Sequence, residues 1–158
     1  MFLTTLCRAL NNAKIRYAVV GGYAVALHGA VRGTVDVDLV LSFDEDSFVD
    51  AERVFHRLGL RGRLPVDAKQ VFQFRKEYLE NRNLVAWSFY DPIHPAHQLD
   101  VILTHDLNKM DVETFPIEGV KVCVVSIKSL IKMKKASDRP QDREDVKALQ
   151  GILKHAKR

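Results

Sequence analysis

The sequence predicts a single domain of the α/β (α+β) class, in which a mixed central sheet is flanked by helices and closed by C-terminal helices. Short β-branched runs alternate with helical patterns from residue 2 to 57, and strand-like runs dominate the middle of the chain. Helical spacing returns after residue 126. A chain of 158 residues with 47% apolar content can bury one real core, so one domain spanning 1–158 is expected.

The N-terminal part combines apolar residues at helical spacing with two runs that have strand character. A helix is expected where apolar positions recur every three or four residues, and a strand where β-branched residues alternate with other types. In chain order, these patterns predict a helix at 2–13, a strand at 15–20, a short helix ending near Gly29, a strand at 34–42, a helix at 42–57 and a loop at 60–67.

The remainder of the chain reads as strands followed by two helices. Its patterns predict strands at 71–76, 84–91 and 98–103, a hairpin at 113–125 that turns at Glu118-Gly119, and helices over 126–156. Pro140 is expected to open the last helix, with Asp138 as its N-cap. Residues 15–125 are therefore expected to form the central part of the domain, between the N-terminal helix and the C-terminal helices.

Composition narrows the classes of protein that fit. No apolar run reaches the length of about 18 residues that a membrane span needs, so no membrane partner is expected. Cys7 and Cys123 lie within apolar patterns, which favours reduced thiols and a cytoplasmic protein. The formal net charge of +4 is compatible with a polyanionic ligand such as a nucleotide.

Two carboxylates interrupt the predicted strand at 34–42. Alternation places Thr34, Asp36 and Asp38 on one face of that strand, with the two acids roughly 6.6 Å apart along it. Two like charges in a half-buried position repel each other, so either one is protonated or a cation lies between them. Carboxylate oxygens suit hard cations, and Mg²⁺ is the first choice.

Asp100 is a third candidate acid, because it stands alone within the apolar run QLDVIL. An isolated carboxylate in a buried strand is costly. If the two strands are neighbours, three carboxylates converge on one or two metals, a geometry that aligns attacking and leaving oxygens in phosphoryl transfer. A surface carboxylate or a salt-bridge partner is the other interpretation of Asp100.

Gly21 and Gly22 separate the strand at 15–20 from the following helix. Glycines at such a junction let backbone amides approach phosphate oxygens closely. The pair is followed, after thirteen residues, by Asp36-Val37-Asp38-Leu39. This combination of a glycine pair and a spaced acid pair is more specific than either feature alone.

The combination resembles the signature of the DNA polymerase β-like nucleotidyltransferase superfamily. Its extended form, Gly-Gly-Tyr-Ala with a later His28-Gly29 and the run from Arg32 to Asp38, is similar to AbiEii-type toxins and related minimal nucleotidyltransferases. The C-terminal segment LIKMKKASDRPQDREDVKAL resembles the closing motif of that family. The matching positions in the closing motif are Lys134, Arg139, Asp142 and Asp145.

The resemblance implies a Mg²⁺-dependent transfer of NMP from an NTP to an acceptor. Asp36 and Asp38 would ligate the metal, and Asp100 would be a third catalytic acid or metal ligand. The nucleotide-binding residues would be Gly21, Gly22, Arg32, Thr34 and Lys134. The acceptor hydroxyl could belong to RNA or tRNA, a protein or a small molecule, and the protein could be a toxin with a cognate antitoxin. Because the chain ends soon after the closing motif, the larger C-terminal region of AbiEii-type toxins is expected to be missing.

Other interpretations of the same residues stay open. The domain could be a non-catalytic nucleotide-binding or partner-binding module, or a metal-dependent phosphodiesterase or nuclease. Asp36 and Asp38 could also lie together on a solvated strand face. Arg32 could pair with an acid, and Lys134 could belong to an ordinary solvated lysine face. Asp142 and Asp145 are expected to form ion pairs with Arg139 or Arg143, and His28 is expected to cap or pack. His94 and His97 have metal-like spacing but no partner in the sequence nearby.

Overall fold

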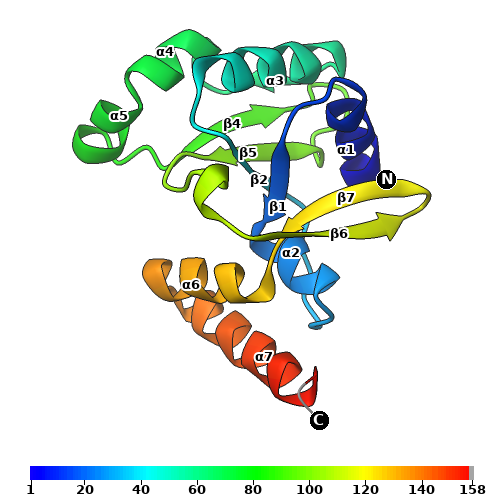
Figure 1. Cartoon of the computed structure of the whole chain (residues 1–158). Helices are drawn as coiled ribbons and strands as arrows, with labels where there is room; N and C mark the ends of the chain where they lie inside the picture. Colours follow the sequence, from blue (N-terminus) through cyan, green and yellow to red (C-terminus); the bar gives the residue numbers. More distant parts are fainter. Residues whose placement is uncertain (157–158) are drawn as a thin grey trace.

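The computed structural model describes residues 1–156, which form one seven-stranded mixed sheet with helices packed around it (Figure 1). The strand order is β3-β4-β5-β2-β1-β7-β6. The β1–β7 and β2–β5 pairs are parallel and the other neighbouring pairs are antiparallel. The predicted class, a mixed α/β sheet with helices at its C-terminal end, is confirmed.

The strands are β1 (Tyr17–Val20), β2 (Val37–Leu41), β3 (Arg61–Gly62), β4 (Ala86–Tyr90), β5 (Gln98–Ile102), β6 (Val112–Ile117) and β7 (Val120–Val125). The α-helices are α1 (Phe2–Asn12), α2 (Gly21–Leu27), α3 (Glu45–Arg57), α4 (Ala68–Gln73), α5 (Arg75–Asn81), α6 (Ile127–Ser137) and α7 (Pro140–Ala156). A 3-10 turn, η1, covers Leu107–Lys109. Figure 1 shows α3 and α4 along one side of the sheet, with α6 and α7 on the opposite side.

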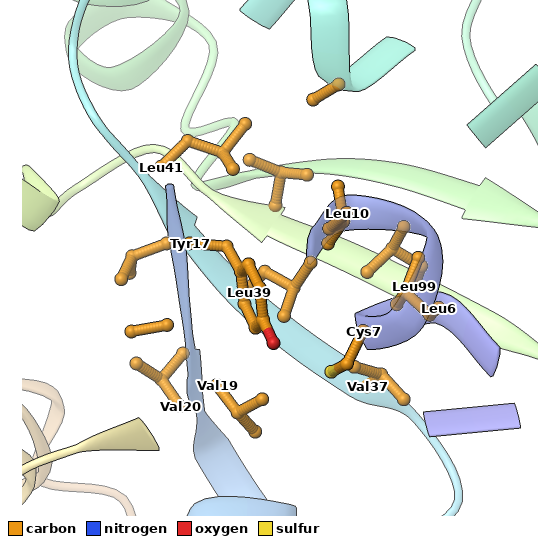
Figure 2. Packing of buried hydrophobic residues seen from close by; sticks show 14 of the residues in the cluster. Leu6, Cys7, Leu10, Tyr17, Val19, Val20, Val37, Leu39, Leu41 and Leu99 are labelled. Atoms are coloured by element: carbon orange, nitrogen blue, oxygen red, sulfur yellow. The ribbon is translucent and has the colours of Figure 1, made fainter. Parts of the chain in front are cut away.

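The part of the core with the largest buried side chains lies between the sheet and the helices α1 and α3, where Phe48 and Phe55 of α3 are fully buried. Leu6 and Leu10 of α1 are fully buried beside Leu39 of β2 and Leu99 of β5 (Figure 2). Burying each such side chain contributes about 1.5–3 kcal/mol. Because side chains alternate along a strand, the side chains of Val37, Leu39 and Leu41 that fill this core leave Asp38 on the opposite face of the sheet.

The hairpin predicted at 113–125 is confirmed. Ile117 pairs with Val120 across the turn, so Glu118 and Gly119 are the two central residues. Both have positive φ, 49° and 77°, as the tight hairpin turns that match strand twist require. Pro116 lies on the edge strand β6, where its missing N–H costs no sheet hydrogen bond.

The predicted strand at 71–76 is wrong, because this segment is helical. Helix α4 begins at Ala68, and Asp67 caps it by accepting a hydrogen bond from the N–H of Gln70. The Gln70 side chain in turn accepts from the N–H of Asp67, which completes a capping box. Val71 is the buried apolar position of this short helix. The predicted loop at 60–67 also contains the two-residue strand β3.

The second predicted strand, 34–42, is shorter than expected, because β2 begins only at Val37. Val20 of β1 pairs with Asp38, and the residue that follows Val20, Gly21, already belongs to α2. The segment before Val37 therefore has no strand beside it on that side. The expectation that Thr34, Asp36 and Asp38 share one strand face is wrong for the first two residues.

Pro140 opens α7, as predicted, but Asp138 does not cap that helix. Asp138 is the C-cap of α6, with a left-handed φ of 47°, and its carboxylate accepts a hydrogen bond from Arg143. Asp has a short polar side chain, which makes it one of the few non-glycine residues that tolerate this conformation. Over residues 1–156, no helix has both the length and the apolar character that a bilayer crossing requires.

Candidate functional site

Asp38 and Asp100 form a carboxylate pair on the face of the sheet opposite α1. They are register partners on the parallel strands β2 and β5, so the predicted adjacency of these strands is confirmed. Ser88 of β4 is the register partner of Asp100 on its other side, and its hydroxyl donates a hydrogen bond to Asp100 Oδ1. Sequence reasoning missed Ser88, although alternation along 84–91 would have placed it on this face.

The turn between β1 and α2 lies directly against this carboxylate pair. Gly21 has a φ of +68°, and a Cβ at this position would collide with Asp38 Oδ2 and lie 2.9 Å from Asp38 Cγ. Only glycine therefore permits both the backbone conformation and the close approach. The Gly21 backbone and the Asp38 carboxylate share one small region, which is the arrangement expected of a turn that faces phosphate beside an acid.

Gly22 makes a second close approach, to the loop that precedes β2. A Cβ on Gly22 would lie 2.7 Å from Thr34 Oγ1 and 3.5 Å from the Arg32 guanidinium carbon. The Thr34 hydroxyl donates a hydrogen bond to the carbonyl oxygen of Asp36, 3.4 Å away. The predicted nucleotide-binding residues Gly22, Arg32 and Thr34 are thus brought together, and Asp36 lies exposed at the end of the same loop.

The electrostatics of Asp38 reflect its surroundings. Burial, together with the nearby charges of Asp100 and Asp36, raises its pKa from an ordinary value of 3.8 to about 7. Lys134 and Arg139 act in the opposite direction and lower the pKa, but they do not offset the burial and the two neighbouring acids. The ionised form of Asp38 is therefore unfavourable in the free protein, and a bound cation would stabilise it.

Lys134 lies in a buried ion-pair cluster contributed by α6 and α7. Its ammonium is 3.1 Å from Asp142 Oδ1 and 3.0 Å from Asp145 Oδ2, and its side chain is 8% exposed. Arg32 joins the same cluster, with its Nε 3.2 Å from Asp145 Oδ1. Both cations predicted to contact phosphate are thus held by carboxylates of α7.

Asp142 is the better satisfied of the two acids of this cluster. Burial alone would raise its pKa, but hydrogen bonds from Arg139, Ser137 and Lys134 hold the pKa well below its usual range. The predicted Asp142–Arg139 ion pair is confirmed at 2.9 Å. Asp145, which was expected to pair with Arg139 or Arg143, pairs with Arg32 and Lys134 instead, while Arg143 binds Asp138.

His28 and His97 lie outside the carboxylate pair and the ion-pair cluster. His28 caps and packs, as predicted: it is the C-cap of α2, its Nε2 lies 2.7 Å from the Val125 carbonyl oxygen, and its ring contacts Phe115 edge-on. His97 stacks on Phe2 at 4.7 Å between ring centroids. These contacts explain the positions of both imidazole rings by local packing and hydrogen bonding.

The carboxylates of this region are the candidate ligands of a Mg²⁺ ion. Within residues 1–156, no three acidic, histidine or cysteine side chains already stand close enough together to hold a metal ion. Asp38 and Asp100 nevertheless offer carboxylate oxygens side by side, and Asp36 lies on the adjoining loop near enough to raise the pKa of Asp38. Hard oxygen donors of this kind fit Mg²⁺, which keeps several waters and needs only one or two carboxylates.

A cavity of about 390 Å³ lies away from these acids, under α3 and the segment before α4. Its lining includes Glu52, His56, Asp67 and Phe89. These residues lie near the edge of the sheet formed by β3 and β4. The carboxylate pair and its glycine turn, rather than this cavity, concentrate the groups that can do chemistry.

Comparisons of the sequence find no matching protein-family model and no matching curated protein. Solved structures do match in fold. A nucleotidyltransferase-like antigenic protein from Paracoccidioides brasiliensis is 18% identical, with 96% of this chain and 73% of that chain covered and a TM-score of 0.60. The antibiotic-resistance factor ANT(2″)-Ia is 14% identical, with 96% and 82% covered and a TM-score of 0.64.

The lincosamide antibiotic adenylyltransferase LnuA, solved with lincomycin bound, is 12% identical, and 96% of each chain is covered with a TM-score of 0.63. Identities this low establish the fold and leave the activity to be argued from the site. The chain therefore has the nucleotidyltransferase fold, and it is similar in structure to antibiotic adenylyltransferases.

Proposed function

We propose that this protein is a Mg²⁺-dependent nucleotidyltransferase, which binds an NTP and transfers NMP to a hydroxyl acceptor. The observation that carries the proposal is the contact of the Gly21 turn with Asp38, whose register partner is Asp100. A phosphate-facing turn beside two carboxylates is the minimum that binding a metal-bound triphosphate requires. The nucleotidyltransferase fold supports the proposal independently.

In the proposed reaction, the acceptor hydroxyl oxygen forms a bond to the α-phosphorus, and the bond from that phosphorus to the α–β bridging oxygen breaks. Pyrophosphate leaves, and the hydroxyl proton passes to a base. Asp100 is the candidate base or metal ligand, because its hydrogen bond from Ser88 fixes one carboxylate oxygen and leaves the other free to act. Mg²⁺, held by Asp36 and Asp38 with Asp100, would neutralise charge that develops on the phosphates.

The glycine turn and the nearby cations would hold the nucleotide. Gly21 and Gly22 would present backbone amides to phosphate oxygens, at a place where no side chain fits. Thr34 and Arg32 lie against Gly22 and would contact the triphosphate from the loop side. Lys134 would act from within its ion-pair cluster, as a buried positive charge that lowers the energy of the bound phosphates.

The test is a titration of the purified protein with each of the four NTPs, with and without Mg²⁺. Saturable binding that needs the metal is expected for the wild type and is expected to be lost in the variant Asp36→Asn/Asp38→Asn. The matched control is Asp46→Asn/Asp50→Asn, which removes two negative charges from exposed positions of α3. Binding that survives the loss of Asp36 and Asp38 would contradict the proposal.

The acceptor would be sought with the preferred NTP labelled at its α-phosphate. ANT(2″)-Ia has been solved with adenylyl-2″-tobramycin and LnuA with lincomycin. An aminoglycoside and a lincosamide are therefore the first small molecules to offer as acceptors, followed by tRNA and protein fractions. Transfer of the label to the acceptor, together with release of unlabelled pyrophosphate, would identify the substrate.

A second candidate function is a nucleotide-binding module without turnover. It is favoured by two observations: Arg32 and Lys134 are already paired with Asp145, and Asp36 stands exposed on its loop. Metal-dependent NTP binding with no pyrophosphate release in the presence of any acceptor would support this module over the enzyme.

The sequence resemblance to AbiEii-type toxins supports a more specific proposal. In this proposal the transferase is a cytoplasmic toxin that a cognate antitoxin neutralises. Induced expression in a bacterial host is the direct test. Growth arrest by the wild type, and none with Asp36→Asn/Asp38→Asn at equal protein level, is the result expected of a toxin. Normal growth with the wild type would leave the transferase proposal standing and remove the toxin role.

A further inference from the structure

The buried cluster that contains Lys134 also connects the C-terminal helix to the glycine turn. Asp145 of α7 is 3% exposed, and its two carboxylate oxygens face different partners. Oδ1 lies 3.2 Å from Arg32 Nε and accepts a hydrogen bond from Gln141, whereas Oδ2 lies 3.0 Å from Lys134 Nζ. A single side chain of α7 thus contacts both cations that the proposed function assigns to the nucleotide.

Arg32 links Asp145 to the glycine turn, because it contacts both. It belongs to the loop of residues 30–36, which starts after α2 and ends at Asp36. Its guanidinium carbon lies 3.5 Å from the position of a Cβ on Gly22, and one of its NH groups donates to the Gly33 carbonyl oxygen. The loop has no strand neighbour before Val37, so few backbone contacts fix it. Its anchor in the direction of α7 is the Arg32–Asp145 ion pair.

Asp142 and Asp145 bind different sets of partners. Its oxygens are bound by Arg139, Ser137 and Lys134, all of which belong to α6 or the junction between α6 and α7. Asp142 therefore joins the two C-terminal helices to each other. Asp145 is the acid that joins them to the loop beside the glycine turn.

We propose that Asp145 is a positioning residue for the nucleotide site: by holding Arg32, it fixes the loop of residues 30–36 against Gly22 and thereby sets the place of Thr34 and Asp36. This inference rests on the proposed nucleotide binding and deepens it. Asp145 itself touches no nucleotide. Its effect on the loop passes through Arg32, and Lys134 keeps Asp142 as a partner when Asp145 is removed. Removing Asp145 should therefore weaken binding no further once Arg32 is gone.

The first experiment is a double-mutant cycle on the affinity for Mg²⁺ and the preferred NTP. Asp145→Ala and Arg32→Ala are each expected to weaken binding about tenfold, equivalent to about 1.4 kcal/mol, and the double variant is expected to weaken it by the same factor as Arg32→Ala alone. Arg32→Lys keeps a cation for Asp145 and is expected to retain most of the affinity. Additive losses in the double variant would overturn the proposal.

The second experiment reads the loop directly and needs no nucleotide. Backbone ¹⁵N order parameters of the free protein are expected to fall at residues 30–36 in Asp145→Ala, with those of the strands of the sheet unchanged. The matched control is Arg143→Ala, which removes an exposed ion pair to Asp138 from the same helix. Unchanged order parameters at residues 30–36, or a uniform decrease over the whole chain, would overturn the positioning role.

The two experiments separate this inference from the function on which it rests. If the wild type binds no NTP with Mg²⁺, the proposed function fails, and the order parameters at residues 30–36 still decide whether Asp145 fixes the loop. If the wild type binds and the order parameters at residues 30–36 are unchanged in Asp145→Ala, the function stands and the positioning role fails.

Discussion

Asp38 and Asp100 lie opposite each other on neighbouring parallel strands, on the face of the sheet that points away from α1. A buried apolar sheet would gain stability from valine or leucine at either position. The two carboxylates instead repel each other, and Gly21 is kept without a side chain so that Asp38 fits beside it. This unfavourable pair of charges is the observation on which the proposed Mg²⁺ site rests.

Asp38→Asn is expected to stabilise the free protein at pH 8 by roughly 1–3 kcal/mol, because it removes a charge that burial and two acids disfavour. The same change is expected to remove the rise in thermal midpoint that Mg²⁺ gives the wild type. Urea unfolding and thermal scans measure both effects. Asp46→Asn on the exposed side of α3 is the control, and equal behaviour of the two variants would contradict the assignment.

The stability of the free protein is expected to fall as the pH rises from about 4 to about 7. The pKa of Asp38 is raised in the folded protein, so in this interval the folded state binds more protons than the unfolded state. The stabilisation from protonated Asp38 is complete below the unfolded value near 4 and is lost as the pH passes the folded value near 7. Urea midpoints at pH 5 and pH 8 measure it, and Asp38→Asn should show a smaller difference between them.

Mg²⁺ is expected to stabilise the protein more at pH 8 than at pH 5. At pH 5 Asp38 carries a proton, which competes with the metal, whereas at pH 8 it is ionised. The measurement is the thermal midpoint against Mg²⁺ concentration at both pH values. A gain that is the same at both pH values, or that persists in Asp36→Asn/Asp38→Asn, would place the metal elsewhere on the protein.

Gly21→Ala is expected to destabilise the protein by about 2 kcal/mol or more, because the left-handed backbone costs about 1–2 kcal/mol and the new methyl group collides with the Asp38 carboxylate. Gly151→Ala is the matched control. Gly151 lies inside α7, and a methyl group added there would meet nothing within 4 Å, so alanine should add about 0.5–1 kcal/mol of stability. Denaturant midpoints of the two variants should therefore move in opposite directions.

The sequence was sufficient to predict the elements whose patterns are local. Helix α1, the hairpin at Glu118-Gly119 and the start of α7 at Pro140 each follow from spacing or turn residues, and all three are present. The error at residues 71–76 arose from counting apolar residues and overlooking Asp67 and Gln70. Their capping box is a local helix signal that outweighs a short β-like run.

Only part of the site could be predicted, because its geometry depends on contacts between segments that are distant in the sequence. The strand positions of Asp38 and Asp100 follow from side-chain alternation, but the parallel pairing that puts them in register depends on contacts between distant segments. The partners of Arg32 and Lys134 lie 113 and 8 residues away on α7, and many acids of the chain could have paired with them. Periodicity cannot choose among such pairings, because the choice is made by how the C-terminal helices dock.

Lys134→Met tests whether the buried lysine mainly stabilises the fold or binds phosphate. The substitution keeps the length of the side chain but leaves Asp142 and Asp145 without their shared cation, so a loss of about 3 kcal/mol of stability is expected. Lys132→Met, on the exposed face of the same helix, should change stability by less than about 0.5 kcal/mol.

Unfolding midpoints and NTP affinity, measured on both variants, separate the two roles of Lys134. If Lys134→Met is destabilised and the protein that remains folded still binds Mg²⁺ and NTP within a fewfold of the wild type, the lysine acts as the counter-ion of α7. If stability is unchanged and nucleotide affinity collapses, Lys134 contacts the phosphates directly, and its ion pairs with Asp142 and Asp145 must open when the nucleotide enters. That second result would also make α7 a moving part of the site, since the two acids would need new partners.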